Sequence, residues 1–157
     1  MSNTQGILIK RLSSADLDTM VGLNQLFGDV FDDPDTYTGQ PPDADYLSDL
    51  LASDTFIALF AMQGKDVVGG LAAYELRKFE QRRSEIYIYD LAVSAAHRRQ
   101  GIARGLIGKL QNLGAERGAY VIFVQADTDE DDQPAIALYS SMGEREDVLH
   151  FDIPVVR

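Results

Sequence analysis

The stretch from Asp90 to Gly105 constrains this chain most, because it changes from a strand to a helix within a few residues. It begins with the end of an apolar strand and crosses a short turn that contains Arg98 and Arg99. After Gly101, apolar residues recur at the helical spacings of three and four. They are Ile102, Leu106, Ile107, Leu110 and Leu113. Such a turn brings backbone N–H groups and two arginines to the positive end of a helix dipole, which predicts an anion site.

The spacing within the turn is more specific than its charge. Arg98-x-x-Gly101-x-Ala103 fits the pattern Arg/Gln-x-x-Gly-x-Gly/Ala, and Leu-Ala-Val precedes it. This resembles the acetyl-coenzyme A signature of the GNAT (Gcn5-related) N-acetyltransferases; the alternative is an ordinary strand–turn–helix connection with surface arginines. The resemblance implies acetyl-CoA as co-substrate. The residues that it implies in binding are Leu91, Ala92, Val93, Arg98, Arg99, Gln100, Gly101, Ile102, Ala103 and Arg104.

Bulk properties exclude several classes of protein. A length of 157 residues with 45% apolar content predicts one globular domain, residues 1–157. No run approaches the ~18 apolar residues of a membrane span, and no secretory signal is recognisable, so we expect a cytoplasmic protein. The absence of cysteine rules out a cysteine nucleophile, and two histidines are few for a histidine-based zinc site, so no metal is expected. A formal charge of −11 disfavours nucleic acid and suits a cationic small molecule.

Periodicity and turn residues predict an α+β chain. Strands are expected at 7–12, 55–62, 67–76, 85–93, 119–125 and 148–156. Helices are expected from Ser13 onward, at 45–52 with a cap at Asp43, at 102–117 and at 134–142, and residues 29–42 read as a loop. The order resembles the GNAT fold, which implies a mixed, mostly antiparallel sheet flanked by about four helices. It also implies that parallel strands 4 and 5 splay apart, with a bulge near Tyr89–Leu91.

Acetyl transfer to an amine needs a base, a polarised carbonyl and an acid for the leaving thiolate. Because Asp90 directly precedes the Leu-Ala-Val of the signature, we interpret it as the general base, acting directly or through water. A strand-end acid without a catalytic role is the alternative. Glu85, on the same strand, is a second candidate for the base, for an ammonium-binding group or for a solvated side chain.

The resemblance also supplies the acid. The segment Ala135-Ile-Ala-Leu-Tyr139-x-x-x-Gly143 is similar to the GNAT pattern Ala-x-x-Leu-Tyr-x-x-x-Gly-Phe, whose tyrosine protonates the coenzyme sulfur. Two departures exist. Glu144 stands in place of the phenylalanine, and Asp131-Asp132 stand near an asparagine that many members have. Without the resemblance, a tyrosine on an amphipathic helix is an ordinary core residue.

Acidic residues gather in two loops, which the GNAT architecture places at the acceptor cleft. The residues that we expect to bind acceptor ammonium groups are Asp32, Asp33, Asp35, Glu85, Asp127 and Asp129. The spacing Asp127-x-Asp129-x-Asp131 also suggests calcium. An EF-hand loop, however, requires glycine at position six and glutamate at position twelve, where this chain has Asp132 and Leu138.

A closer resemblance covers most of the chain from Tyr46 onward. The segments KFEQRRSEIYIYDLAVSAAHRRQGIA, GAYVIFVQAD, ALYSSMG and HFDI resemble the aminoglycoside 3-N-acetyltransferases of type I. That resemblance implies acetylation of the 3-amino group of the deoxystreptamine ring in gentamicin-class antibiotics, a sequential reaction, antibiotic resistance and a homodimer. The alternatives are acetylation of another polyamine or of a protein amine, and a non-catalytic acetyl-CoA-binding module.

Overall fold

The structure is a computed structural model that describes residues 6–156. Two compact units make up the chain, one up to Gln125 and the other from Ala126 onward, and each is described by itself. The first unit contains β1 (Ile7–Arg11), α1 (Leu17–Val30), α2 (Pro34–Thr38), α3 (Ala44–Ala52), β2 (Phe56–Gln63), β3 (Asp66–Arg77), β4 (Ser84–Val93), a 3₁₀ turn (Ala95–His97), α4 (Ile102–Arg117) and β5 (Ala119–Val124). The second contains a 3₁₀ turn (Glu130–Asp132) and α5 (Gln133–Met142).

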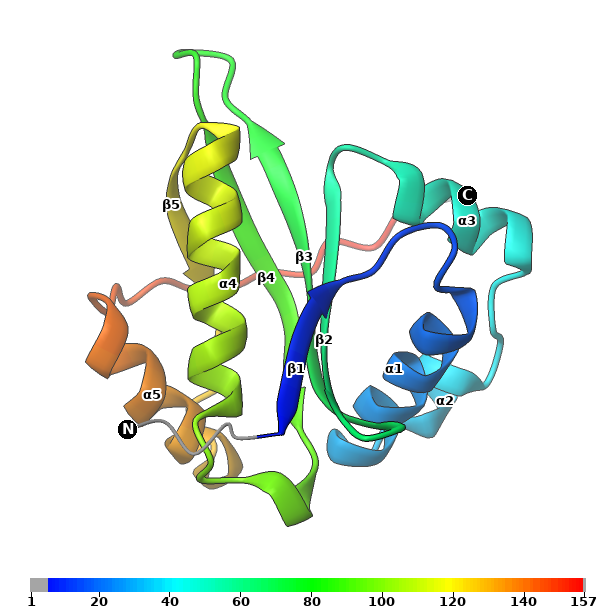
Figure 1. The fold of residues 1–157 in the computed structure, drawn as a ribbon. Helices are drawn as coiled ribbons and strands as arrows, with labels where there is room; N and C mark the ends of the chain where they lie inside the picture. Colours follow the sequence, from blue (N-terminus) through cyan, green and yellow to red (C-terminus); the bar gives the residue numbers. More distant parts are fainter. Residues whose placement is uncertain (1–5, 157) are drawn as a thin grey trace. The chain divides into compact units, whose positions relative to one another are not determined.

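The first unit is a three-layer arrangement around one sheet. The strands lie in the order β1-β2-β3-β4-β5, antiparallel except for the parallel pair β4–β5. Helix α4 covers one face of the sheet, and α1, α2 and α3 lie on the other side (Figure 1). This confirms the predicted mixed, mostly antiparallel GNAT-like sheet. Within residues 6–156, no helix is long and apolar enough to cross a bilayer.

Local sequence signals account for most element boundaries. Asp43 caps α3, since its Oδ1 accepts a hydrogen bond from the Tyr46 N–H at 2.8 Å. Gly118 ends α4 in the left-handed region at φ 84°. The expected start at Ser13 is instead a turn, in which the Asp16 carboxylate accepts from Ser13, and α1 begins at Leu17.

The glycine pair of β3, Gly69 and Gly70, lets neighbouring elements pack closely against the strand. A Cβ atom on Gly70 would lie 2.7 Å from the Leu59 carbonyl oxygen and against the Leu23 side chain of α1. Only glycine therefore lets α1 approach the sheet at this point. The core on this face joins α1 and α3 to the sheet. Its buried members include Leu23, Phe27, Leu47, Leu51, Phe56, Phe60, Ala72 and Ala92.

Strand β4 carries a bulge at Tyr89, at the place where one was predicted. Ala73 pairs with Ile88 and the adjacent Ala72 pairs with Asp90, which leaves Tyr89 as an extra residue. Alternate residues before the bulge, such as Ile86, face α4, where Ile86 lies against Gly114. After the bulge, Ala92 belongs to the core on the α1 face. The extra residue therefore turns Asp90 from the α4 face toward the α1 face.

The same bulge coincides with the splaying of the two parallel strands. Pairing between β4 and β5 runs from Ser84 to Ile88, while β4 itself continues to Val93. Among the described residues, β5 contributes no partner to the last five residues of β4. The prediction that strands 4 and 5 splay apart is confirmed.

Two further expectations about secondary structure are wrong. Residues 34–38 form the short helix α2 rather than a loop, because Pro34 lies at its first turn and Asp33 caps it. Residues 148–156 form no strand. Their alternating apolar pattern is typical of a strand, but a strand needs a neighbouring backbone to pair with. The side chains of Val148 and Val155 are 70% and 93% exposed.

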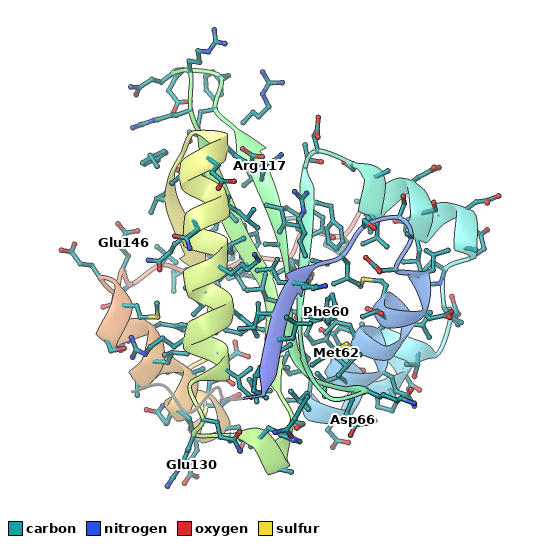
Figure 2. The ribbon with its side chains drawn as sticks, viewed as in Figure 1. Phe60, Met62, Asp66, Arg117, Glu130 and Glu146 are labelled. Carbon is teal, nitrogen blue, oxygen red and sulfur yellow. The ribbon has the colours of Figure 1, made fainter. Side chains whose placement is uncertain are left out.

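A buried ion pair connects the end of α4 to the sheet. The Glu75 side chain is only 8% exposed, and it lies 2.7 Å from the Arg117 guanidinium. The Ser84 hydroxyl donates to the other Glu75 oxygen at 2.6 Å. Arg117, near the C-terminal end of α4 (Figure 2), also donates to the carbonyl oxygen of Asp54. These contacts fix the C-terminal end of α4 against β3, next to the loop that leads into β5.

Candidate active site

The turn between β4 and α4 has the geometry of an anion site. Arg99 and Gly101 both adopt left-handed backbone angles, at φ 62° and 78°, so the chain turns sharply before the helix. Gly101 occupies the cap position of α4 without a side chain that could accept from the first-turn N–H groups. These N–H groups have no intrahelical acceptor and lie at the positive end of the helix dipole. Arg98 and Arg99 are exposed beside them, and the Arg98 Nε donates to the Val93 carbonyl oxygen at 3.5 Å.

The turn and the splayed strand together fit an extended, amide-containing anion such as acetyl-CoA. The β4 backbone from Tyr89 to Val93 has no β5 partner within residues 6–156, so its edge is open to another extended chain. The turn before α4, where no side chain caps the first N–H groups, follows the end of this edge and suits a pyrophosphate. The predicted coenzyme-binding residues are therefore contiguous, on one strand edge and one helix start.

Asp90 lies in the part of β4 that has no β5 partner, and its side chain lines a cavity on the face of the sheet that α1 covers. Its carboxyl is half-buried, and its Oδ1 accepts a hydrogen bond of 2.9 Å from the Tyr37 hydroxyl of α2. Burial raises the pKa of Asp90, and the hydrogen bond from Tyr37 acts in the opposite direction. A carboxyl with a raised pKa beside a cavity is suited to accept a proton from a bound amine.

The cavity beside Asp90 has a volume of about 240 Å³. It is smaller than the ~300–1,000 Å³ typical for drug-sized ligands, so it suits a single ring of a larger molecule. Its walls are mostly apolar and aromatic, with tyrosine hydroxyls, the Asn24 amide and Asp90 as polar groups. The lining residues are Met20, Asn24, Phe27, Pro42, Tyr46, Leu47, Leu50, Phe56, Ala72, Tyr74, Tyr89 and Asp90.

Glu85 lies at the other end of β4. Its Oε1 accepts from the Tyr120 hydroxyl at 2.5 Å and lies 3.6 Å from the Lys78 ammonium. Glu85 lies five positions before Asp90 on the strand, which corresponds to roughly 16 Å. The structure therefore does not bring the two carboxylates together, and Glu85 already has partners of its own.

The acids of the first loop surround the start of α2. The Asp33 carboxylate accepts from the Thr36 N–H at 3.3 Å and caps the helix. Asp35 lies in the first turn of α2, and Asp32 has a left-handed backbone angle, φ 52°. All three belong to the segment that carries Tyr37, the hydrogen-bond donor to Asp90.

The remaining predicted residues belong to the second unit. The Asp127 N–H donates to the Asp132 carboxylate at 2.8 Å, and the Asp129 carbonyl accepts from Gln133 at 3.3 Å. Tyr139 lies on α5, and burial, with a smaller contribution from Asp132, raises its pKa to about 12. A phenol with that pKa keeps its proton at neutral pH. The roles of Tyr139, Asp127 and Asp129 in a shared site stay predictions.

The sequence reasoning missed the tyrosines around Asp90. Tyr37, Tyr46 and Tyr74 come from three separate segments, and no local motif links them to Asp90. The sequence did contain one signal for the helix that carries Tyr37, because Asp33-Pro34 is a typical helix start. Across residues 6–156, no three histidine, cysteine or carboxylate side chains gather in a way that could hold a metal ion.

The fold and the turn define a class of protein: a mixed sheet whose two parallel strands splay apart, followed by a basic turn at the start of a helix. The family described as "Acetyltransferase (GNAT) family" matches residues 23–143, and the chain belongs to this family of acetyltransferases. The family uses acetyl-CoA as its acetyl donor.

Solved structures add closer relatives. An aminoglycoside acetyltransferase, HMB0005, from an uncultured soil metagenomic sample is 61% identical, with a TM-score of 0.94 over 96% of this chain and 99% of that one. A second aminoglycoside acetyltransferase from an uncultured soil metagenomic sample, meta-AAC0020, was solved in complex with sisomicin. It is 33% identical, with a TM-score of 0.86 over 96% of this chain and 97% of that one.

A curated relative is more distant. N-acetyltransferase 8F1 of Rattus norvegicus is 31% identical over 83 residues, which are 53% of this chain and 37% of that protein. The chain therefore matches well under half of the length of this relative.

Proposed function

We propose that this protein transfers the acetyl group of acetyl-CoA to the 3-amino group of the deoxystreptamine ring of gentamicin-class aminoglycosides. The observation that carries the proposal is the 61% identity to an aminoglycoside acetyltransferase over nearly the whole of both chains. Because acetyl-CoA is a cytoplasmic metabolite, the reaction would take place in the cytoplasm. There it would protect the cell from the antibiotic.

The geometry around Asp90 supports an amine acceptor. The half-buried carboxyl borders a cavity of about 240 Å³, in which the aromatic walls can pack against one aminocyclitol ring. Tyrosine rings also attract ammonium groups through their π faces. Asp32, Asp33 and Asp35 lie on the segment that carries Tyr37 and are proposed to bind further ammonium groups, as are Asp127 and Asp129.

Direct transfer follows from the residues available. Asp90 accepts a proton from the amine as its nitrogen attacks the acetyl carbonyl carbon, with Glu85 or water as the alternative base. Backbone N–H groups of Leu91–Val93 donate to the carbonyl oxygen as it gains charge. Tyr139 donates its proton to the sulfur when the carbon–sulfur bond breaks. The chain contains no cysteine to form an acetyl-thioester, so initial-velocity plots should intersect.

An acetyl-transfer screen tests the proposal. Purified protein is incubated with acetyl-CoA and gentamicin, sisomicin, spermidine or a lysine peptide, and release of free coenzyme A is followed. We expect activity on the aminoglycosides and an N-acetyl group on the 3-amino nitrogen in the NMR spectrum of the product. Acetylation at a different amine would remove the 3-N assignment. Activity on spermidine or the peptide alone would favour the other acceptors, and no turnover would favour a binding module.

Coenzyme binding is tested separately at the β4–α4 turn. We propose that Arg98, Arg99, Gln100 and the backbone from Gly101 to Arg104 hold the pyrophosphate. Calorimetry should show roughly tenfold weaker coenzyme A binding after Arg98→Ala and Arg99→Ala together, because charge-assisted contacts to phosphate are lost. Arg82→Ala, an exposed arginine on the β3–β4 hairpin, is the matched control. Equal affinity in both variants would remove this site.

A homodimer completes the proposal. Strand β5 is an edge strand, and residues 148–156 carry exposed apolar side chains. Exposure of this apolar surface to water is unfavourable. We propose that a second copy of the chain covers these surfaces. Light scattering should give the mass of a dimer for the full chain and that of a monomer after deletion of residues 148–157. A monomeric full chain at micromolar concentration would contradict it.

A further inference from the structure

We propose that Tyr37 is a positioning residue for acetyl transfer, holding one oxygen of the Asp90 carboxylate so that the other oxygen faces the acceptor amine. The inference rests on the proposed role of Asp90 as general base. Tyr37 lies 53 residues before Asp90 and belongs to no part of the coenzyme signature. Its hydroxyl is 2.9 Å from Asp90 Oδ1, a well-formed hydrogen bond.

The structure holds the Tyr37 ring firmly. Its centroid lies 5.9 Å from the Phe27 ring of α1 and 5.7 Å from the ring of Phe31, which follows α1, and these two phenylalanine rings stack on each other at 5.8 Å. A Cβ on Gly28 would lie 3.3 Å from the Tyr37 Cβ, so glycine leaves the room for α2 to pack there. The Asp33 cap sets the start of α2. The phenol is therefore pre-oriented toward Asp90 by packing that does not depend on Asp90.

The hydrogen bond also favours the charged form of Asp90. Burial raises the pKa of Asp90, and the bond from Tyr37 is the effect that opposes it. Burial, followed by the charge of Asp90, raises the pKa of Tyr37 well above its usual range. Tyr37 therefore keeps its proton and remains a donor throughout the pH range of catalysis.

Within residues 6–156, the Tyr37 hydroxyl is the side-chain donor that bonds to Asp90, and no cationic side chain lines the cavity beside it. The titratable side chains that face it are Tyr74 of β3, Tyr87 and Tyr89 of β4, and Tyr46 of α3 across the cavity, while Asp33 lies near Tyr37. The residues that line the cavity include no lysine, arginine or histidine. Without the Tyr37 hydroxyl, Asp90 would bind its proton more tightly, and its carboxylate could rotate away from the amine.

The first test is the pH dependence of Tyr37→Phe, which removes the hydroxyl but keeps the ring packed against Phe27 and Phe31. The acid limb of kcat/KM reports ionisation of the free enzyme. We expect the acid limb to move to higher pH, so that kcat/KM falls about tenfold on that limb and approaches the wild-type value at pH values above it, because a hydrogen bond to a charged group is lost. The KM for acetyl-CoA should not change. Tyr74→Phe removes a cavity hydroxyl not bonded to Asp90; it can change the height of the profile through substrate packing, but the midpoint of the acid limb should stay at its wild-type pH.

The second test needs no substrate. The ¹³C chemical shift of the Asp90 carboxyl is followed through a pH titration of the free protein, and its midpoint should be higher in Tyr37→Phe than in the wild type. If the midpoint rises while the rate profile is unchanged, Tyr37 touches Asp90 without serving the reaction, and the proposal is overturned. If neither changes, the contact itself is wrong. Full activity of Asp90→Asn would instead refute Asp90 as the base. The difference in the Asp90 titration midpoint between Tyr37→Phe and the wild type would still be observed.

Discussion

The Asp90 carboxyl is half-buried, and burial raises its pKa, which affects stability as well as catalysis. A carboxyl whose folded pKa lies above its unfolded value favours the folded state while it is protonated. That contribution is fully present below the unfolded pKa and is lost as pH rises through the folded pKa. At neutral pH the charged form is therefore a cost to folding. We expect Asp90→Asn to raise the free energy of unfolding at pH 8, with a gain that shrinks toward pH 4, in urea denaturation.

The same substitution should have the opposite effect on the reaction. Asparagine keeps the shape of the side chain and can still accept from Tyr37, but it cannot take a proton from the amine. We expect the rate with gentamicin to fall by roughly 10²–10⁴-fold, the usual contribution of a general base, and to recover partly at high pH as free amine accumulates. An intact rate at saturation with weaker substrate binding would identify Asp90 as an ammonium anchor. Glu85 or water would then be the base.

Tyr139 is expected to hold its proton at neutral pH until it donates that proton to the coenzyme sulfur. Because burial raises its pKa to about 12, its hydroxyl should not ionise between pH 7 and pH 10, and the wild-type rate should show no decline from Tyr139 in that range. Tyr139→Phe removes only the hydroxyl, so kcat should fall about 10²-fold while calorimetry shows unchanged coenzyme A affinity. A wild-type kcat, with chemistry shown to be rate-limiting, would make Tyr139 a packing residue.

At the scale of single residues, the sequence indicated Asp90 as a candidate base because a recognisable motif directly follows it. Asp90 directly precedes Leu-Ala-Val, so its position follows from the turn a few residues later. No motif adjoins Tyr37, and its contact with Asp90 could not be predicted because a contact across 53 residues depends on how α1 and α2 pack. The tyrosines of the cavity were missed for the same physical reason.

Among the elements, those with their own periodicity and end signals were predicted to within a few residues. Helix α4 has an apolar stripe and a left-handed glycine at its end, and β4 has the bulge that was expected near Tyr89. Helix α2 was missed because five residues are too few to show a period. Residues 148–156 were assigned to a strand because alternation was visible, but pairing depends on a neighbour that alternation does not identify.

The junction between α4 and the sheet provides an element-scale prediction. Removing Arg117 leaves the Glu75 carboxylate almost fully buried without its ion pair, which costs ~3–5 kcal/mol in fully buried pairs. Since the Arg117 side chain is 24% exposed, we expect a smaller loss, about 2 kcal/mol in the free energy of unfolding of Arg117→Ala. Urea denaturation at pH 7 measures it.

Two further variants identify the cause of that loss. Lys109→Ala, at an exposed position of the same helix, should change the free energy of unfolding by less than ~0.5 kcal/mol. Adding Glu75→Gln to Arg117→Ala removes the unpaired charge and should restore part of the stability. A double variant no more stable than Arg117→Ala would show that packing of the arginine side chain, rather than its charge, is what matters.

On the scale of the whole molecule, opposite charges serve the two proposed substrates. The chain carries a formal charge of −11, yet Arg98 and Arg99 adjoin the β4–α4 turn. An aminoglycoside with several ammonium groups would be attracted over long distances by the net charge, whereas the coenzyme pyrophosphate would depend on short-range contacts at the turn. The sequence predicted this division from composition and one motif.

Salt should therefore affect the two substrates differently. The screening length falls from ~30 Å at 0.01 M to ~10 Å at 0.1 M, so long-range attraction is largely lost over that range. We expect the KM for gentamicin to rise about tenfold between 0.01 M and 0.3 M KCl, with kcat nearly constant, because charge steering changes association more than chemistry. Sodium sulfate at matched ionic strength controls for specific effects of chloride. The same increase in the KM of a singly charged amine, or a KM for gentamicin that does not depend on salt, would show that the net charge does not guide the acceptor.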